Sequence, residues 1–136
     1  MRKLLFPIAI ALTGVAGCAL PPETIRVKPL PADGSGLAWN DMVHRARTLA
    51  MSATEAFYRD DWSSVAAAAK SLEQTALYLP KSPDVPAARK ASVDAQTQAL
   101  LTEAQALRNA AQAKDVDKTN NSLQKVHMRV RSLGVE

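Results

Sequence analysis

Apolar residues recur every three or four positions from Leu37 to the end of the chain, which is the period of an α-helix. Four such stripes follow one another, separated by polar or helix-breaking residues. They cover residues 37–57, 62–79, 91–111 and 116–133. The third stripe starts with Ala91 and Ala95, and the fourth starts with Val116. The pattern therefore predicts four amphipathic helices in succession.

The residues between the stripes are typical of helix ends. The Asp60–Asp61 pair and Asp115 stand where a side chain can cap the second and fourth helices, and Pro86 suits the first turn of the third. Gly134 stands where the last helix is expected to end. Because short connections force consecutive helices to run antiparallel, we expect an all-α, up-down-up-down four-helix bundle.

The placement of glycine supports a helical fold. The five glycines occupy positions 14, 17, 34, 36 and 134, so residues 37–133 contain none. A β-rich fold needs turn residues every 8–12 positions or so, and glycine-rich phosphate loops are excluded for the same reason. The segment 37–136 also holds 20 alanines, which favour helix and allow close approach of helix axes but bury little area.

The N-terminal segment has the features of an export signal. Arg2 and Lys3 precede a mostly apolar run over residues 4–15, which is too short for a comfortable membrane span. The run ends in Val-Ala-Gly-Cys at residues 15–18 and resembles the bacterial lipoprotein signal. The resemblance implies cleavage of residues 1–17 and attachment of lipid to Cys18. An ordinary secretory signal with a chance cysteine is the alternative.

The resemblance also implies a location. Ala19 follows the cysteine where an aspartate often marks retention in the inner membrane of bacterial lipoproteins. We therefore expect an anchor in the outer membrane of the cell envelope, facing the periplasm. Several acyl chains hold a protein stably at a bilayer, since each buried methylene contributes about 0.8 kcal/mol.

Residues 18–36 are expected to form a disordered tether between Cys18 and a folded domain at residues 37–136. The tether contains four prolines and ends in Gly-Ser-Gly. At a rise of about 3.1 Å per residue it would reach roughly 55 Å. Without residues 1–17 the chain carries 15 basic and 13 acidic residues, a net charge of +2. This balance does not indicate binding to nucleic acid.

Residues for acid–base or nucleophilic catalysis are sparse. Apart from Cys18 there is no cysteine, and the only histidines are His44 and His127. The carboxylates are scattered and those at positions 60, 61, 115 and 117 flank helix starts. We therefore expect no enzymatic activity and no resident cofactor.

The fourth predicted helix nevertheless resembles the last helix of cytochrome c′ and of the related b-type four-helix cytochromes. In these families a histidine near the C-terminus ligates haem iron and a following arginine meets a haem propionate. His127 and Arg131 match these positions, whereas Val130 replaces an aromatic residue. Leu123 and Val126 stand where cytochrome c′ carries its attachment cysteines, so covalent haem is excluded.

Two further features extend this resemblance. The Lys-Ser-Pro-Asp run at residues 81–84, with Pro86, is similar to the connection between helices two and three of the b-type relatives. Those relatives use a methionine on the first helix as the second axial ligand, and Met42 matches it. Since Met42 and His127 both lie roughly 7–9 Å from helix ends that coincide in an antiparallel bundle, we expect one layer of the core to hold both. Core filling by Met42 is the alternative.

Two other groups of side chains have simpler interpretations. A copper site would need residues that do not converge on one helical face, namely Met42, His44, Met51, His127 and Met128. Lys118, Lys125 and Arg129 share one face of the fourth helix and form either a solvated stripe or a docking surface for anionic head groups or an acidic protein.

Two hypotheses of different classes follow from the sequence. The first is a lipid-anchored envelope bundle without enzymatic activity, which resembles cytochrome c′ in fold and acts as a binding or structural module for an unidentified envelope partner. The second is a b-type electron carrier with Met42 and His127 as haem ligands. A metal or stress sensor of the envelope is a third possibility that depends on location alone.

Overall fold

The structure is a computed structural model that describes residues 27, 30–32 and 37–134. The expected signal peptide, Cys18 and most of the tether lie outside the described residues, so these predictions stay predictions. Within the described ranges no helix is both long and apolar enough to cross a bilayer.

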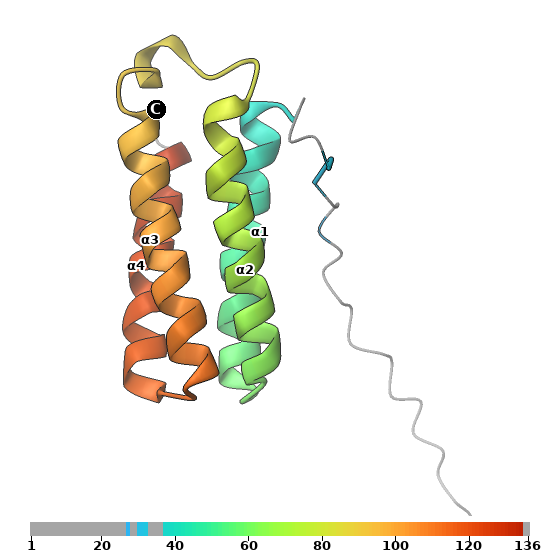
Figure 1. The fold of residues 1–136 in the computed structure, drawn as a ribbon, viewed down its shortest axis with the longest axis vertical. Coiled ribbons are helices and arrows are strands. Elements are labelled where there is room, and N and C mark those ends of the chain that lie inside the picture. The colour runs from blue at the N-terminus through green and yellow to red at the C-terminus, as the bar shows by residue number, and fades with distance from the viewer. Residues whose placement is uncertain (1–26, 28–29, 33–36, 135–136) are drawn as a thin grey trace, which may run out of the picture.

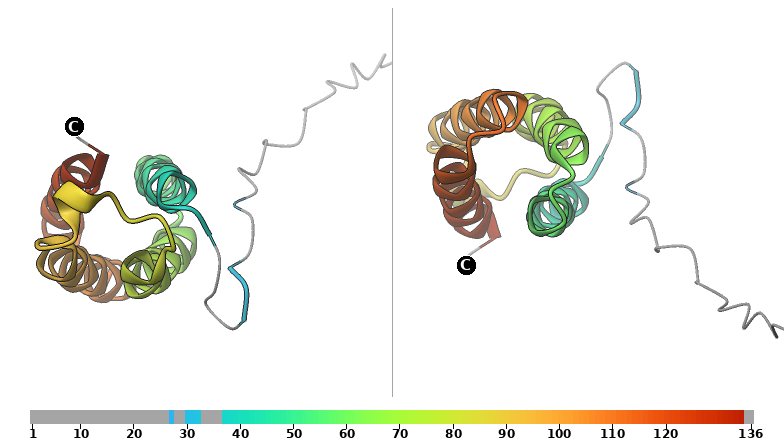
Figure 2. Two further views of the ribbon diagram at one scale, coloured as in Figure 1. Left: turned by 90° about the horizontal axis from the view of Figure 1, so that it is seen from above. Right: turned by 90° about the horizontal axis from the view of Figure 1, so that it is seen from below.

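The described chain forms an all-α, up-down-up-down four-helix bundle, as the sequence predicts (Figure 1). Its main helices are α1 (Trp39–Tyr58), α2 (Trp62–Tyr78), α3 (Val93–Gln112) and α4 (Val116–Gly134). Two short 3₁₀ helices, η1 (Leu79–Lys81) and η2 (Ala87–Arg89), lie in the long connection between α2 and α3. Viewed along the bundle, the helices follow one another around a ring, and α4 returns to the side of α1 (Figure 2).

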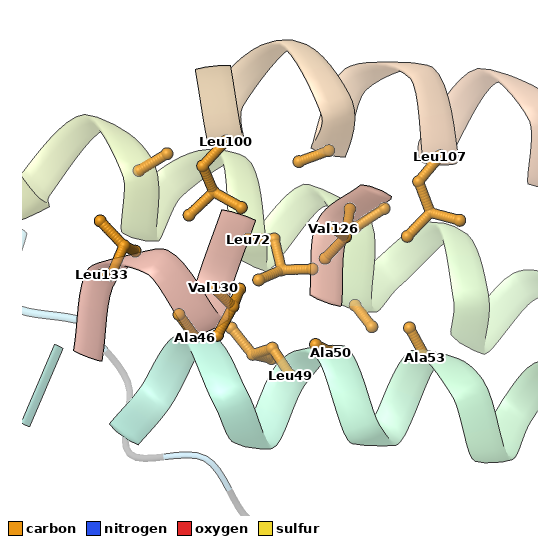
Figure 3. Close-up of a cluster of buried hydrophobic side chains, with 14 of the residues drawn as sticks. Ala46, Leu49, Ala50, Ala53, Leu72, Leu100, Leu107, Val126, Val130 and Leu133 are labelled. Carbon is orange, nitrogen blue, oxygen red and sulfur yellow. The ribbon is translucent and has the colours of Figure 1, made fainter. Parts of the chain in front are cut away.

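The core combines large apolar side chains with alanines on α1, α2 and α3, whereas the apolar residues that α4 buries are all leucines and valines. Figure 3 shows Leu72 of α2, Leu100 and Leu107 of α3, and residues of α4 pointing towards the centre. Helix α1 contributes mainly alanines to this layer, together with Leu49. Alanine at successive turns lets α1 lie close to its neighbours, which limits the apolar area that the core can bury.

Two of the predicted stripes begin later than expected. Residues 87–89 form η2, so α3 starts only at Val93, and Pro86 precedes η2 rather than the first turn of α3. Helical phase therefore buries Val93 and Thr97, whereas Ala91 and Ala95 are exposed. The Thr97 hydroxyl donates to the Val93 carbonyl at 2.8 Å, which satisfies it in the core. In α4 the first buried residue is Thr119, and Val116 is exposed.

The two ends of the bundle are built differently. The closed end consists of the turns at residues 59–61 and 113–115, which join α1 to α2 and α3 to α4. Asp61 accepts a hydrogen bond from the Ser64 N–H at 3.1 Å, and Asp115 accepts one from the Lys118 N–H at 3.0 Å. Both predicted caps are thus confirmed.

The open end contains the start of α1, the end of α4 and the connection at residues 79–92, which crosses it (Figure 1). Ala38 cannot cap α1 with its side chain; instead Asp84 accepts a hydrogen bond from the Trp39 N–H at 2.7 Å. At the other side, Arg89 donates to the Ser132 carbonyl in the last turn of α4 at 2.7 Å. These two contacts hold the connection to both α1 and α4.

Candidate binding site

The open end contains a pocket of about 930 Å³. Helix α1 lines it with Trp39, Val43 and Arg47, and the last turn of α4 lines it with Leu133 and Gly134. The connection and the start of α3 close the opposite side. The volume falls in the range of about 300–1,000 Å³ that is typical of small-molecule sites. We call this feature the open-end pocket.

The lining has an apolar part and a polar part. Trp39, Val43 and Leu133 are buried and belong to the bundle core, so the inner wall of the pocket is continuous with the core. The polar part consists of side chains from α1, the connection and α3, namely Asn40, His44, Arg47, Arg89, Ser92 and Gln96. A ligand in this pocket would meet apolar surface on one side and hydrogen-bonding groups on the other.

Two guanidinium groups flank the last turn of α4. Arg89 donates one N–H to Ser132, which leaves further N–H groups on a side chain that carries five. Arg47 lies against Gly134 so closely that a Cβ atom at this position would collide with Nη2 of Arg47. The absence of a side chain at Gly134 thus gives the guanidinium of Arg47 its place at the pocket.

The electrostatic character of the open-end pocket is positive. None of its described lining residues is acidic, whereas Arg47 and Arg89 both carry a full charge. The C-terminal carbonyl groups of α4 offset part of this charge, because the C-terminal end of a helix is its negative end. Since arginine binds carboxylates through two parallel hydrogen bonds, the pair favours a planar anion.

One buried polar atom in this region has no partner. Gln96 lines the pocket, and its Oε1 is inaccessible to solvent and makes no hydrogen bond in the structure. An unsatisfied buried amide costs about 1–3 kcal/mol, and such groups are uncommon in native proteins. Because this oxygen has no solvent-accessible area, a ligand in the pocket could bind it only after the Gln96 side chain had moved.

His127, the expected haem ligand, has a protein partner. Its Nε2 lies 2.8 Å from the Thr54 hydroxyl, and that hydroxyl donates to the Ala50 carbonyl at 3.0 Å. With the hydroxyl proton donated to Ala50, the Thr54 oxygen can accept from Nε2 in the His127 tautomer that carries its proton there. Burial, and to a smaller degree the positive charge of Arg131, lowers the pKa of His127 below its usual value.

Met42, the other expected ligand, lies in a different layer. Thr54, the partner of His127, is twelve positions after Met42, or about 18 Å along α1. Met42 is buried and borders a cavity of about 10 Å³ near Leu37, Tyr78 and Ser82. The expectation that the two side chains share a layer is therefore wrong.

The register of α4 against α1 accounts for most of this separation, because Gly134, seven positions after His127, lies against Val43 and Arg47 rather than beside the first residue of α1. The direction of helical side chains adds to it. Side chains on a helix lean towards its N-terminus, so Met42 leans towards the open end and His127 towards the closed end. Antiparallel packing of α1 and α4 thus moves the two groups apart. Leu49, Leu72 and Val130 are buried and fill the core between the helices (Figure 3). The arrangement does not fit a haem held by Met42 and His127, and Arg131, the expected propionate contact, is exposed.

The remaining candidate residues lie at the surface. Met51 and Met128 are more than half exposed, and among the described residues no three His, Cys, Asp or Glu side chains are grouped as metal ligands. Lys118 lies 3.1 Å from Asp115, and Arg129 lies 3.9 Å from Glu103. Two of the three residues of the basic stripe thus have acidic neighbours, which favours a solvated stripe.

Sequence reasoning missed the open-end pocket. It places His44 at the surface, where the structure confirms it to be exposed, but not at the mouth of a pocket. Arg47, Arg89 and Gln96 lie on three different elements and have no motif in common. Of these three residues, only Arg47 could have been connected to the pocket from the sequence. It follows the buried Val43 by one helical turn and therefore lies on the same side of α1. The chain matches no protein-family model, no curated protein and no solved structure.

Proposed function

We propose that this chain is a non-enzymatic, lipid-anchored binding protein of the cell envelope, whose four-helix bundle binds a small molecule in the open-end pocket. The observation that carries this proposal is the pocket itself. It combines a suitable volume with an apolar inner wall and convergent polar groups from α1, the connection, α3 and α4. The resemblance to cytochrome c′ then concerns the fold and not the cofactor.

The position of the pocket agrees with an anchor at Cys18. The chain from Cys18 enters the bundle at α1, whose first residue, Trp39, lines the pocket. The tether thus joins the bundle at the end that holds the pocket. A tether of roughly 55 Å would let this end move freely above the bilayer from which ligand or partner arrives.

The chemistry of the pocket supports binding rather than catalysis. The titratable side chains of its described lining are two arginines and one exposed histidine. Ser92 also lines it, but its hydroxyl donates to the Arg89 carbonyl at 3.3 Å and has no histidine partner among the described contacts. A nucleophile with an adjacent base, which covalent catalysis requires, is therefore missing from the described lining.

The anchor is tested by labelling cells with radioactive palmitate. We expect label in the intact chain and none in Cys18→Ser, which should also leave the membrane fraction. Ala19→Asp is the matched variant for location, since it should keep the label but move the protein to the inner membrane. Membrane association of unlabelled Cys18→Ser would overturn the lipoprotein proposal.

The binding function is tested by filling the pocket. Ala88 is exposed and lines the pocket, whereas Ala87 is exposed in the same short helix and does not. We expect native mass spectrometry of the full chain, purified from envelope membranes, to show a bound small molecule that Ala88→Trp loses and Ala87→Trp keeps. A ligand-free wild-type protein that also binds nothing from a fragment library would overturn the proposal.

The haem-binding alternative has its own measurement. It requires a Soret absorbance band in protein purified from haem-sufficient cells, and the band must disappear in His127→Ala. Because His127 already binds Thr54 and lies far from Met42, we expect a colourless protein that does not take up added haem. A Soret band that depends on His127 would favour the electron-carrier function instead.

A further inference from the structure

We infer that the ligand of the open-end pocket is a small carboxylate with a compact apolar body. This inference rests on the proposed function and specifies its ligand class. It follows from two features of the pocket that no sequence motif announces: the two guanidinium groups and the exposed apolar residues Pro86 and Ala88.

The carboxylate follows from Arg47 and Arg89. They come from α1 and from the connection and flank the last turn of α4, which contributes Ser132 and Gly134. No described acid lines the pocket to neutralise them. Hydrogen bonds between arginine and a carboxylate are about twice as strong as those between neutral groups. A neutral or cationic ligand would leave the positive charge of the two arginines without a counter-charge.

A phosphorylated ligand fits less well. Phosphate sites commonly use the free N–H groups at a helix N-terminus, often with glycine-rich backbone. Here the N–H of Trp39 at the start of α1 already donates to Asp84, and residues 37–133 contain no glycine. Without such backbone donors, two arginines partly offset by the carbonyl groups of α4 match a single negative charge better than a double one.

The apolar body follows from the apolar part of the lining. Trp39 and Val43 are almost fully buried and Leu133 is not exposed at all, so the apolar surface that a ligand can reach comes mainly from Pro86 and Ala88, which are exposed. This limits the apolar contact to about one ring or a short chain and excludes a long acyl chain.

The test uses two probes that differ in charge. We expect 4-hydroxybenzoate to bind the full chain in uncharged detergent, as measured by isothermal titration calorimetry. The neutral 4-hydroxybenzamide, which has nearly the same shape, should bind at least about tenfold more weakly, because it loses the charge-assisted hydrogen bonds. Equal affinity for the two probes would overturn the carboxylate inference.

Variants locate the site. Arg47→Gln removes an exposed side chain and should weaken 4-hydroxybenzoate binding about tenfold without unfolding the protein. Arg59→Gln is the matched control, because Arg59 is also exposed but follows α1 at the closed end. An equal effect of Arg59→Gln would place binding outside the pocket and overturn the inference.

The outcomes separate this inference from the proposed function. Binding of a neutral molecule that is lost in Ala88→Trp would overturn the carboxylate but keep the binding function. Chemical shift changes at Arg47 with nanodiscs containing phosphatidylglycerol, together with none from 4-hydroxybenzoate, would replace the small carboxylate by an anionic lipid surface. A protein with no ligand in any of these experiments would overturn both.

Discussion

The closed and open ends of the bundle differ in the range of the contacts that build them. At the closed end, Asp61 binds Ser64 and Asp115 binds Lys118, and in both pairs the residues are three positions apart. At the open end, the bond from Trp39 to Asp84 spans 45 positions and the bond from Arg89 to Ser132 spans 43. One end is therefore fixed by local sequence and the other by the folded bundle.

This difference has a functional consequence. At the closed end, a hollow of about 280 Å³ lies beside the turn that joins α3 to α4. The connection at residues 79–92 crosses the open end (Figure 1) and is held at Asp84 and Arg89, and the open-end pocket of about 930 Å³ lies beside it. The end that is least determined by local sequence thus has the larger space for a ligand.

The largest difference in the free energy of unfolding is expected between two variants in which a core leucine near one end or the other is changed to alanine. Leu107 and Leu133 are both fully buried, but Leu133 lines the open-end pocket. Leucine-to-alanine changes in cores cost about 2–5 kcal/mol, depending on how far the site can collapse or take up water. We expect Leu107→Ala to lower the free energy of unfolding by about 4 kcal/mol and Leu133→Ala by about 2 kcal/mol.

Urea denaturation of the full chain measures both values. The core residue Leu72, which lies on α2 away from the pocket lining, provides a reference through Leu72→Ala. If Leu133→Ala costs as much as Leu107→Ala, the pocket does not relieve the cavity and the two ends are packed alike.

A second difference concerns the caps. Asp84→Ala removes the only side-chain cap described for α1, and loss of such a cap costs about 1 kcal/mol. It should also release the connection, so hydrogen exchange should speed up at residues 39–42 and 82–86 together. Asp115→Ala, a cap at the closed end, should speed up exchange only at the start of α4. Faster exchange at residues 82–86 in Asp115→Ala would remove the distinction between the ends.

The features that local contacts build could be predicted from the sequence, and those that long-range contacts build could not. The caps Asp61 and Asp115 were predictable because capping acts over three positions and leaves a local signature. The buried stripe of α4, with Leu123, Val126 and Val130, was predictable from helical period alone. The fold class follows from such local signals and from the short connections.

The pocket and the position of His127 were not predictable in this way. Arg89 reaches Ser132, and His127 reaches Thr54, only because antiparallel packing brings distant positions together. The layer expected for Met42 and His127 assumed that the start of α1 and the end of α4 coincide, whereas Gly134 lies beside Val43 and Arg47. Contacts of this kind depend on how far one helix is shifted along its neighbour, by about one or two helical turns. The hydrophobic period of the sequence does not specify this shift.

The packing of α1 against α4, which runs from one end of the bundle to the other, should make the stability of the protein depend on pH. Because burial lowers the pKa of His127 in the folded chain, the unfolded chain binds a proton at this position more tightly. Stability should therefore fall as the pH decreases through the unfolded-state value of about 6.5, and recover above it. Denaturation midpoints between pH 5 and 8 measure this effect. His127→Gln should flatten the pH dependence of stability, whereas His44→Gln, which changes an exposed side chain, should leave it unchanged. A wild-type stability that does not vary with pH would contradict the prediction.

The smallest expected change in stability comes from Gly134→Ala. A Cβ atom at this position meets the guanidinium of Arg47 and the Val43 side chain, and the first of these is the flexible end of an exposed side chain that can move aside. Alanine also favours helix over glycine, so we expect the free energy of unfolding to change by less than about 0.5 kcal/mol. The displaced Arg47 should nevertheless weaken binding of 4-hydroxybenzoate, while Gly134→Ala keeps the binding of neutral fragments. A variant that loses stability by much more than this would show that Arg47 cannot move, and that the open end is as rigid as the closed one.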